Sequence, residues 1–323
     1  MKFIIDKEKI KENYKKYSQY GRVFYPVKAN SNKEIIKIIK ELFSYEDRFY
    51  ISNVSQVTSE MDGYLALMNP LMSNENIKGL YEKGCKFFVF DDINKLKNFL
   101  KYAKIEETEI ALRICTMEIN KEVITNLGAS MVEIKEMLEM IKKAKRVGIQ
   151  FYLNPELKKK DAHCLEKMLK ILPYENIDFL SIGGIPNFEL NIDMIRKIQQ
   201  DKNIKQIIFE PGKDLIENTV SLETNIIKVK DNIITIENGI YSGFLDLLLY
   251  NKQFDIYIDE HLLTAQPDDK KKKIHLFGGS ADSADRLGTY YIDDIKITKE
   301  SRVLIKNVGS YFEEFFMNYG KNI

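Results

Sequence analysis

The feature that most constrains the fold is the regular alternation of short apolar runs with amphipathic or polar segments over the first two thirds of the chain. Short runs rich in β-branched and aromatic residues are typical of buried strands, and apolar residues at helical spacing are typical of helices. We expect strands at 23–27, 49–51, 64–68, 87–90, 110–114, 149–153, 177–182 and 207–209. We expect helices at 8–18, 32–43, 75–83, 92–103, 130–145, 157–171 and 189–200, with a weaker one near 53–60.

Strands that alternate with helices in this way are typical of parallel sheets with right-handed crossovers. Eight such units fit an α/β fold built on a closed (β/α)8 barrel of the TIM type. A doubly wound open sheet is the alternative, but no G-x-G-x-x-G motif follows the first expected strand to favour it. The 323 residues also leave room for a smaller second domain.

The pattern changes after about residue 218, where long helical periodicity gives way to short strand-like runs. These runs lie at 219–229, 233–237, 254–258, 274–277, 303–306 and 311–316. We therefore predict a barrel domain over residues 8–217 and a mostly β domain over 218–323. A strand within residues 1–7 is expected to join the β domain.

Composition excludes several classes of function. The formal net charge of +1 gives no global field that would hold nucleic acid. No apolar run is long enough to span a bilayer, and residues 1–7 contain too short an apolar core for a signal peptide. Three cysteines and three histidines are scattered without the spacing of a disulfide framework or a metal site. We expect a cytoplasmic protein with no membrane, nucleic-acid or metal partner.

A lysine, Lys28, ends the first expected strand. A desolvated ammonium has a lowered pKa, and its neutral amine can form a Schiff base with a carbonyl group. Chemistry in a (β/α)8 barrel collects at the carboxyl ends of the strands. The other residues expected there include Asn53, Asn69, Arg113, Tyr152, Gly183, Gly184 and Glu210. This combination suits pyridoxal phosphate. The lysine can bind the aldehyde, the aromatic side chain can lie against the ring, the glycine amides can bind the phosphate, and the carboxylate can bind the pyridinium nitrogen.

The segment Tyr25-Pro26-Val27-Lys28-Ala29-Asn30 resembles the Tyr-Ala-Val-Lys-Ala/Cys-Asn motif of fold-type III pyridoxal-phosphate-dependent enzymes. That group holds alanine racemase and the ornithine, lysine, arginine and diaminopimelate decarboxylases, and the chain is most similar to the decarboxylases. The resemblance implies an alanine racemase-like fold and a Schiff base between Lys28 and pyridoxal 5'-phosphate. It also implies a small amino-acid substrate and a homodimer with shared active sites.

Further motifs match in the family's order and extend the resemblance to cofactor contacts. Glu210-Pro211-Gly212-Lys213 is similar to the family's Glu-Pro-Gly-Arg, which places Glu210 at the pyridinium nitrogen and Gly212 and Lys213 near the phosphate. Gly183 and Gly184 match the phosphate loop, although its usual third glycine is missing. Tyr152 replaces the histidine that stacks on the ring, and Tyr311 matches a tyrosine whose hydroxyl contacts the phosphate.

The resemblance also implies a substrate side that includes Arg113, Tyr241 and Asp282. The loop with Asp282 carries Ala281 where the family has a cysteine, supplied by the partner subunit, that helps to protonate the decarboxylated intermediate. Asn251 replaces the acid that binds the substrate's distal ammonium in ornithine decarboxylases, which argues against a simple diamine-forming site. Asp246 and Asp282 are the candidate substitutes.

The function that these motifs imply is a pyridoxal-phosphate-dependent amino-acid decarboxylase, a carboxy-lyase of polyamine or amino-acid metabolism. Its catalytic residues would be Lys28 and Asp282, and Lys28 or water would supply the proton that Ala281 cannot. One alternative is a racemase or epimerase, which needs a base on each ring face, with Tyr311 or Tyr241 as candidates. Another is a non-catalytic homologue that binds a protein partner, against which the retention of Lys28, Glu210 and Tyr311 argues.

Overall fold

The computed structural model describes residues 1–115, 117, 125–152, 177–185, 188–201 and 203–312. The chain divides into two compact units. The barrel unit comprises Tyr14–Val27 and Lys40–Pro211, and the β unit comprises Met1–Asn13, Lys28–Ile39 and Gly212–Ile323. The domain boundary predicted between residues 217 and 218 stays a prediction. No described helix is long and apolar enough to cross a membrane.

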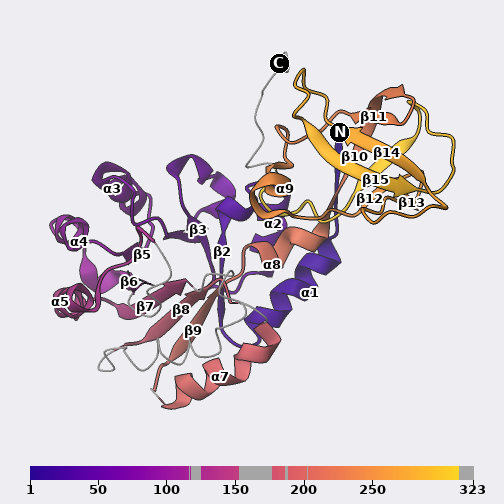
Figure 1. The fold of residues 1–323 in the computed structure, drawn as a ribbon. Helices are drawn as coiled ribbons and strands as arrows, with labels where there is room; N and C mark the ends of the chain where they lie inside the picture. Colours follow the sequence, from indigo (N-terminus) through magenta and orange to yellow (C-terminus); the bar gives the residue numbers. More distant parts are fainter. Residues whose placement is uncertain (116, 118–124, 153–176, 186–187, 202, 313–323) are drawn as a thin grey trace. The chain divides into compact units, whose positions relative to one another are not determined.

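Eight parallel strands close into a barrel in the first of these units, as predicted (Figure 1). The strands are β2 (Arg22–Pro26), β3 (Arg48–Ile51), β4 (Leu65–Leu67), β5 (Phe87–Phe90), β6 (Glu109–Arg113), β7 (Arg146–Tyr152), β8 (Phe179–Gly183) and β9 (Gln206–Glu210). Strand β9 pairs with β2 and so completes the ring. Each strand coincides with one of the apolar runs, because both faces of a barrel strand are buried.

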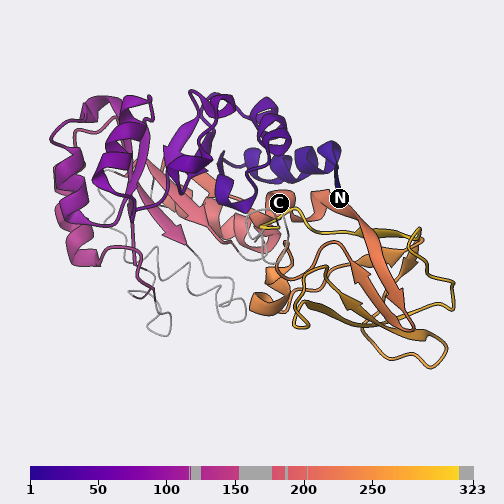
Figure 2. The same cartoon turned by 90° about the horizontal axis from the view of Figure 1, so that it is seen from above.

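In the described part of the barrel unit, helices follow strands β4, β5, β6 and β8. They are α3 (Asn74–Glu82), α4 (Ile93–Phe99), α5 (Met131–Ile141) and α7 (Phe188–Asp201). Helices α3, α4 and α5 lie side by side outside the strands (Figures 1 and 2). Ser73, Asp92 and Ser130 accept backbone N–H groups at the starts of α3, α4 and α5, which is why those helices begin there.

Two predicted helices have other outcomes. The weak helix near 53–60 is wrong, because this stretch forms two 3-10 turns, η2 (Val54–Gln56) and η3 (Ser59–Met61). The Asn53 side chain caps the first turn and bonds Ser55 N–H locally, an alternative to α-helix that asparagine favours. The helix predicted over 157–171 lies outside the described residues. Helices α1 (Lys7–Ser18) and α2 (Lys33–Leu42) match their predictions, and each contributes residues to both units.

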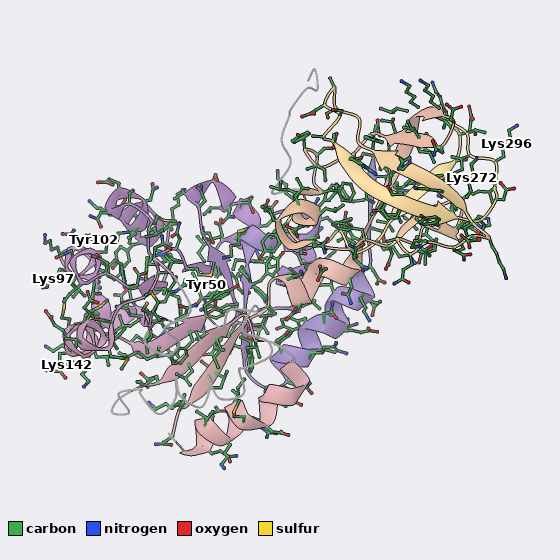
Figure 3. The ribbon with its side chains drawn as sticks, viewed as in Figure 1. Tyr50, Lys97, Tyr102, Lys142, Lys272 and Lys296 are labelled. Carbon is green, nitrogen blue, oxygen red and sulfur yellow. The ribbon has the colours of Figure 1, made fainter. Side chains whose placement is uncertain are left out.

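The middle of the barrel is filled by apolar and aromatic side chains. Phe24, Tyr50, Phe87, Phe179 and Ile208 belong to one buried cluster. The rings of Phe24 and Tyr50 meet edge to face at 4.9 Å between centroids, and those of Phe24 and Phe87 do so at 4.8 Å. Figure 3 shows Tyr50 among the strands. Side chains two positions apart point to the same side of a strand, so residues two positions before or after this layer lie at the two ends of the barrel.

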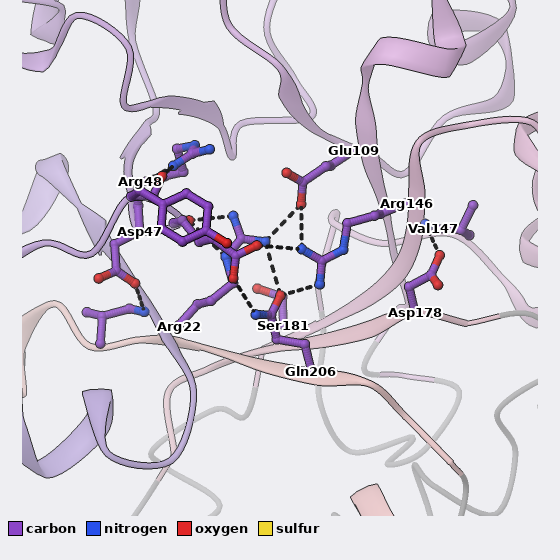
Figure 4. A network of polar contacts seen from close by, with 12 residues as sticks. Arg22, Asp47, Arg48, Glu109, Arg146, Val147, Asp178, Ser181 and Gln206 are labelled. Atoms are coloured by element: carbon purple, nitrogen blue, oxygen red, sulfur yellow. Dashed lines mark hydrogen bonds and ion pairs between the residues drawn. The ribbon is translucent and has the colours of Figure 1, made fainter.

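A network of charged and polar side chains occupies the end of the barrel where the strands begin (Figure 4). We call it the amino-end network; its members are Arg22, Glu46, Glu109, Arg146 and Gln206. The Nη1 atom of Arg22 lies 2.8 Å from Oε2 of Glu109, and that of Arg146 lies 3.6 Å from the same oxygen. Arg22 and Glu109 are both buried. Paired charges therefore close this end.

The second unit is mostly β, as predicted. Its strands are β1 (Lys2–Ile5), β10 (Val220–Lys230), β11 (Ile233–Ile236), β12 (Ile256–Ile258), β13 (His261–Leu262), β14 (Lys272–Phe277), β15 (Arg286–Ile292) and β16 (Arg302–Ile305). They form a sheet in the order β13-β12-β16-β10-β11-β14-β15, and β1 pairs antiparallel with β10. The described part of this unit also contains the short helices α8 (Lys213–Ile216) and α9 (Leu245–Tyr250) and the 3-10 turn η7 (Glu217–Thr219).

One strand prediction in this unit is wrong where the structure describes it. Tyr311 and Phe312 lie in a bend and a turn instead of a strand, and Tyr311 has a φ of 62°. A left-handed backbone cannot continue a strand. Residues 313–316 of the same prediction lie outside the described residues.

Candidate active site

The carboxylate of Glu210, the last residue of β9, is buried and held by side chains of two neighbouring strands. Ser181 of β8 donates its hydroxyl to Oε1 at 2.6 Å. Gln150 of β7 donates Nε2 to both carboxylate oxygens at 3.2 Å. Hydrogen bonds to a carboxylate are short and strong when the oxygen carries the charge. These donors favour the ionised form of Glu210.

The hydrogen-bond chain extends to Tyr50 of β3, whose hydroxyl lies 3.2 Å from Oγ of Ser181. Ser181 has one proton and gives it to Glu210, so Tyr50 must donate to Ser181. Burial raises the pKa of Tyr50 well above its usual value, and the nearby charge of Glu210 raises it further. Tyr50 therefore keeps its proton and remains a donor.

Gly183, the last residue of β8, borders this carboxylate and Tyr152. A Cβ atom at residue 183 would lie 2.8 Å from Oε2 of Glu210 and 3.3 Å from Cδ2 of Tyr152. Only glycine leaves the carboxylate where it is. Gly184 follows with a φ of 68°, a conformation that glycine adopts without strain. This local geometry accounts for the glycine pair in the sequence.

Arg113, at the end of β6, lies above the Tyr152 ring with 5.9 Å between Cζ and the ring centroid. Burial lowers the pKa of Arg113, and the charges of Glu210 and Asp91 oppose that shift. Asp91 follows β5 and accepts a hydrogen bond from Gly128 N–H at 2.8 Å. Burial raises the pKa of Asp91, which was not among the sequence-predicted site residues. The end of the barrel thus gathers an aromatic ring, a guanidinium and carboxyl groups.

In the β unit, the segment with Lys28 is bonded to the segment with Tyr311. Lys28 lies in the 3-10 turn η1 (Val27–Ala29), directly after β2, and not in the strand itself. Tyr311 N–H donates to the Ala29 carbonyl at 2.7 Å, and Asn30 Nδ2 donates to the Gly309 carbonyl at 2.9 Å. Lys28 and Tyr311, which are 283 positions apart in sequence, therefore lie in segments that are bonded to each other.

The predicted phosphate-binding residues Gly212 and Lys213 begin helix α8. Nζ of Lys213 lies 3.3 Å from Oε1 of Glu217, and Lys252 lies 2.9 Å from the same oxygen. Lys213 is half exposed, whereas the Lys252 side chain is buried. The carboxyl group of Asp246 also interacts with both lysines, so Lys213 and Lys252 lie in one charged group with two acids.

Tyr241 and Asp282, predicted on the substrate side, meet directly. The Tyr241 hydroxyl donates to Oδ2 of Asp282 at 2.9 Å, and Ala284 N–H donates to Oδ1 at 2.8 Å. The Ala284 and Tyr241 bonds, in that order, lower the pKa of Asp282. Buried Asp285 accepts backbone N–H groups from both segments, and so ties their loops together.

Asn251, predicted to replace a substrate-binding acid, has a structural reason for its identity. It is the residue after helix α9, with a left-handed φ of 49°, and its N–H donates to the Asp246 carbonyl. Asparagine tolerates this conformation better than most residues. Burial raises the pKa of Asp246, against the opposing charges of Lys252 and Lys213.

The predicted residues thus form two groups. Arg113, Tyr152, Gly183, Gly184 and Glu210 gather at the carboxyl end of the barrel, and the β unit holds Lys28, Gly212, Lys213, Tyr241, Asn251, Asp282 and Tyr311. Sequence reasoning missed Tyr50, Gln150 and Ser181. A signal was present, since Gln150 and Ser181 are polar residues inside apolar runs, two positions before predicted site residues.

No protein-family profile and no curated protein sequence matches the chain. Solved structures do match. Lysine decarboxylase from Selenomonas ruminantium is 18% identical with a TM-score of 0.77, covering 98% of this chain and 88% of that one. Lysine/ornithine decarboxylase from Vibrio vulnificus, complexed with cadaverine, is 17% identical with a TM-score of 0.75, covering 98% and 91%. Arginine decarboxylase from Paramecium bursaria Chlorella virus is 18% identical with a TM-score of 0.73, covering 98% and 92%.

These likenesses define the class by its architecture: the chain has the fold of these amino-acid decarboxylases, a closed barrel joined to a mostly β domain. The predicted alanine racemase-like fold is therefore confirmed. Because the identities are 17–18%, the likeness shows the fold, and the residues of the site must carry any statement about activity.

Proposed function

We propose that the protein is a pyridoxal-phosphate-dependent amino-acid decarboxylase that uses Lys28. The observation that carries the proposal is the buried Glu210 carboxylate at the carboxyl end of the barrel, held by Ser181 and Gln150. A fixed anion there suits a cationic ring nitrogen. Another solved structure of this fold, 19% identical with a TM-score of 0.76 and covering 98% of this chain and 86% of that one, is described as a complex with PLP and cadaverine.

The residues present fit the cofactor. Glu210 would hold the ring nitrogen, Tyr152 would lie against the ring, and the N–H groups of Gly183 and Gly184 would face the phosphate. Gly183 lets Tyr152 and the Glu210 carboxylate lie close to its backbone, since an added Cβ would come within 2.8 Å of Oε2 of Glu210 and 3.3 Å of Cδ2 of Tyr152. When bound, pyridoxal phosphate supplies an electron sink for the pair left when carbon dioxide departs.

The chain's own residues would perform the remaining work. Glu210 keeps the ring nitrogen protonated, because its negative charge favours the cation. Lys28 would bind the aldehyde of the cofactor through Nζ and would give up that position to the amine of the substrate. The Tyr311 hydroxyl and Lys213 hold the phosphate. Because the methyl group of Ala281 cannot act as an acid, Lys28 or water would have to return a proton to the substrate's α-carbon.

The substrate would be an amino acid of the lysine, ornithine, arginine or diaminopimelate type. Tyr241 and Asp282 would contact it as a hydrogen-bonded pair, and Arg113 would meet a carboxylate. Asn251 is explained by its left-handed cap, so its identity does not exclude a distal ammonium. The protein would act in the cytoplasm as a homodimer with shared sites.

A racemase or epimerase reading is less well supported. It requires a second base, and Tyr241 was one candidate. The Tyr241 hydroxyl donates to the Asp282 carboxylate, whose charge opposes loss of the tyrosine proton. A hydroxyl held in this way is a poor base.

The test is where the cofactor attaches. The purified protein is incubated with pyridoxal phosphate, reduced with borohydride, digested, and mapped by peptide mass. We expect the added mass on the peptide with Lys28, and its loss in Lys28→Ala while Lys272→Ala, a change at a surface lysine of β14, keeps it. Attachment at another lysine, or none in the wild type, contradicts the proposal.

Assembly is tested by mixing inactive subunits. If each site takes Lys28 from one subunit and Asp282 from the other, Lys28→Ala and Asp282→Ala proteins should recover part of the activity when combined, because a heterodimer holds one intact site. Carbon dioxide release from the mixed and unmixed proteins is the measurement. No recovery in heterodimers shown to form would place the whole site in one chain.

A further inference from the structure

We propose that Ser181 and Gln150, with Tyr50 behind Ser181, are positioning residues that keep Glu210 ionised and directed at the cofactor's ring nitrogen. The inference rests on the proposed function and deepens it. It adds three residues from the barrel interior to those that the sequence motifs mark. Their effect on the cofactor passes through one carboxylate.

Burial makes this support necessary. Tyr50, Ser181 and Gln150 are each no more than 1% exposed, and Glu210 is 7% exposed. A carboxylate removed from water loses hydration that other donors must replace. The 2.6 Å bond from Ser181 and the paired 3.2 Å contacts from Gln150 supply such donors to both oxygens.

The donors around Glu210 suit its charged form. Tyr50 donates to Ser181, and Ser181 donates to Oε1 of Glu210, so both protons point toward the carboxylate. A protonated Oε1 would confront the Ser181 proton unless Ser181 and Tyr50 both turned. Gln150 presents its NH2 group, and a flipped amide would set its oxygen against the carboxylate. The whole set is consistent with an anion.

The carboxylate is also fixed in position. Gly183 leaves no room for a side chain beside Oε2, and Ser181 and Gln150 hold the group from β8 and β7. Hydrogen bonds to a charged group are stronger than those between neutral groups, so loss of the Ser181 hydroxyl should weaken cofactor binding by about tenfold or more.

The first experiment needs no cofactor. The protein is labelled with glutamate carrying ¹³C at Cδ, and the Glu210 signal is identified by its absence in Glu210→Gln. We expect Ser181→Ala and Gln150→Met to move the Glu210 titration to higher pH, and Tyr50→Phe to move it less in the same direction. Thr108→Val removes another buried hydroxyl at the opposite end of the barrel, and should leave it unchanged.

The second experiment measures pyridoxal phosphate affinity of the same variants by absorbance titration. Weaker binding in Ser181→Ala and Gln150→Met, with Thr108→Val like the wild type, supports the inference. If Ser181→Ala does not fold, Gln150→Met alone decides. Cofactor bound with unchanged affinity and an unchanged Glu210 titration overturns the inference and leaves the proposed function standing. A wild type that binds no cofactor overturns the proposed function, and with it the role inferred for these residues, even where the titration shifts.

Discussion

The two ends of the barrel hold their carboxylates in different ways. At the amino end, Glu109 meets the guanidinium groups of Arg22 and Arg146 at 2.8 and 3.6 Å. At the carboxyl end, Glu210 accepts hydrogen bonds from Ser181 and Gln150, which are neutral. A guanidinium in contact offsets the charge of a carboxylate, whereas a neutral donor stabilises that charge without cancelling it; the charge of Glu210 also acts on the nearby Arg113 guanidinium. We infer from this difference that the amino end serves stability, and we propose that the carboxyl end serves binding.

The same barrel geometry produces both arrangements. Arg22, two positions before Phe24, and Glu210, two positions after Ile208, lie on opposite sides of the apolar layer. That layer of packed rings separates the two sets of charges. The two ends can therefore be changed independently. Substitutions at the amino end should chiefly change the free energy of unfolding, and those at the carboxyl end should chiefly change cofactor binding.

The largest expected effect on stability is at the amino end. Arg22→Ala leaves the buried Glu109 without its closest cation, and loss of one partner from a buried pair costs about 3–5 kcal/mol. Urea unfolding measures the free energy of unfolding. The exposed pair of Lys86 and Glu107 serves as control, and Lys86→Ala should change stability little. Equal losses in the two variants would mean that the amino-end network is not a stability element.

Substitutions at two glycines, one in the apolar layer and one at the carboxyl end, should have effects of intermediate size. Gly148→Ala places a methyl group against the Phe179 ring in the apolar layer, and overpacking typically costs about 1–3 kcal/mol. Gly183→Ala pushes on Oε2 of Glu210, so it should chiefly weaken pyridoxal phosphate binding. Unfolding and cofactor titration of both variants give the contrast. If Gly183→Ala binds the cofactor as the wild type does, the position of the Glu210 carboxylate is not what matters.

The smallest expected effect is in the pH dependence of stability. Burial raises the pKa of Asp91 at the carboxyl end, so the folded protein binds more protons than the unfolded chain. The free energy of unfolding should then fall as the pH rises from the ordinary pKa of aspartate through the raised pKa of Asp91. In Asp91→Asn this part of the pH dependence should be flatter. Unfolding at a series of pH values checks this, and a limb unchanged in Asp91→Asn would contradict it.

Glu46 at the amino end should have the opposite sign. Burial acts to raise the pKa of Glu46, but the Gln206 hydrogen bond and the charges of Arg22, Arg146 and Arg48 together lower it. The ionised carboxylate of Glu46 therefore adds stability at pH values above the ordinary pKa of glutamate. That stability is lost as the pH falls through the lowered pKa of Glu46. Glu46→Gln should lose less stability in acid than the wild type does. A steeper acid limb in Glu46→Gln would contradict this assignment.

Much of the fold could be predicted because each barrel strand coincides with a short, mostly apolar run. The failures have local or tertiary causes. Asn53 favours a 3-10 turn over a helix through its side-chain cap, and Tyr311 leaves the strand region in a segment bonded to Ala29. Strand β15 was missed, and Gly288, with a φ of 153°, interrupts its apolar pattern.

The site was less predictable than the fold. Motif order pointed to Lys28 and Glu210, and the structure shows Glu210 at a strand end, but their roles stay predictions. Ser181 and Gln150 escaped notice because a polar residue in an apolar run gains meaning only when the strand's inward face is known. That face follows from closure of the barrel, which no single run encodes.

Release of labelled carbon dioxide from carboxyl-labelled amino acids tests the central claim most directly. The wild-type protein is loaded with pyridoxal phosphate and offered lysine, ornithine, arginine and diaminopimelate, beside Lys28→Ala and Glu210→Gln. We predict release from at least one amino acid by the wild type, none by Lys28→Ala, and a severe loss in Glu210→Gln. A wild type that holds the cofactor at Lys28 but releases no carbon dioxide from any of them would contradict the account.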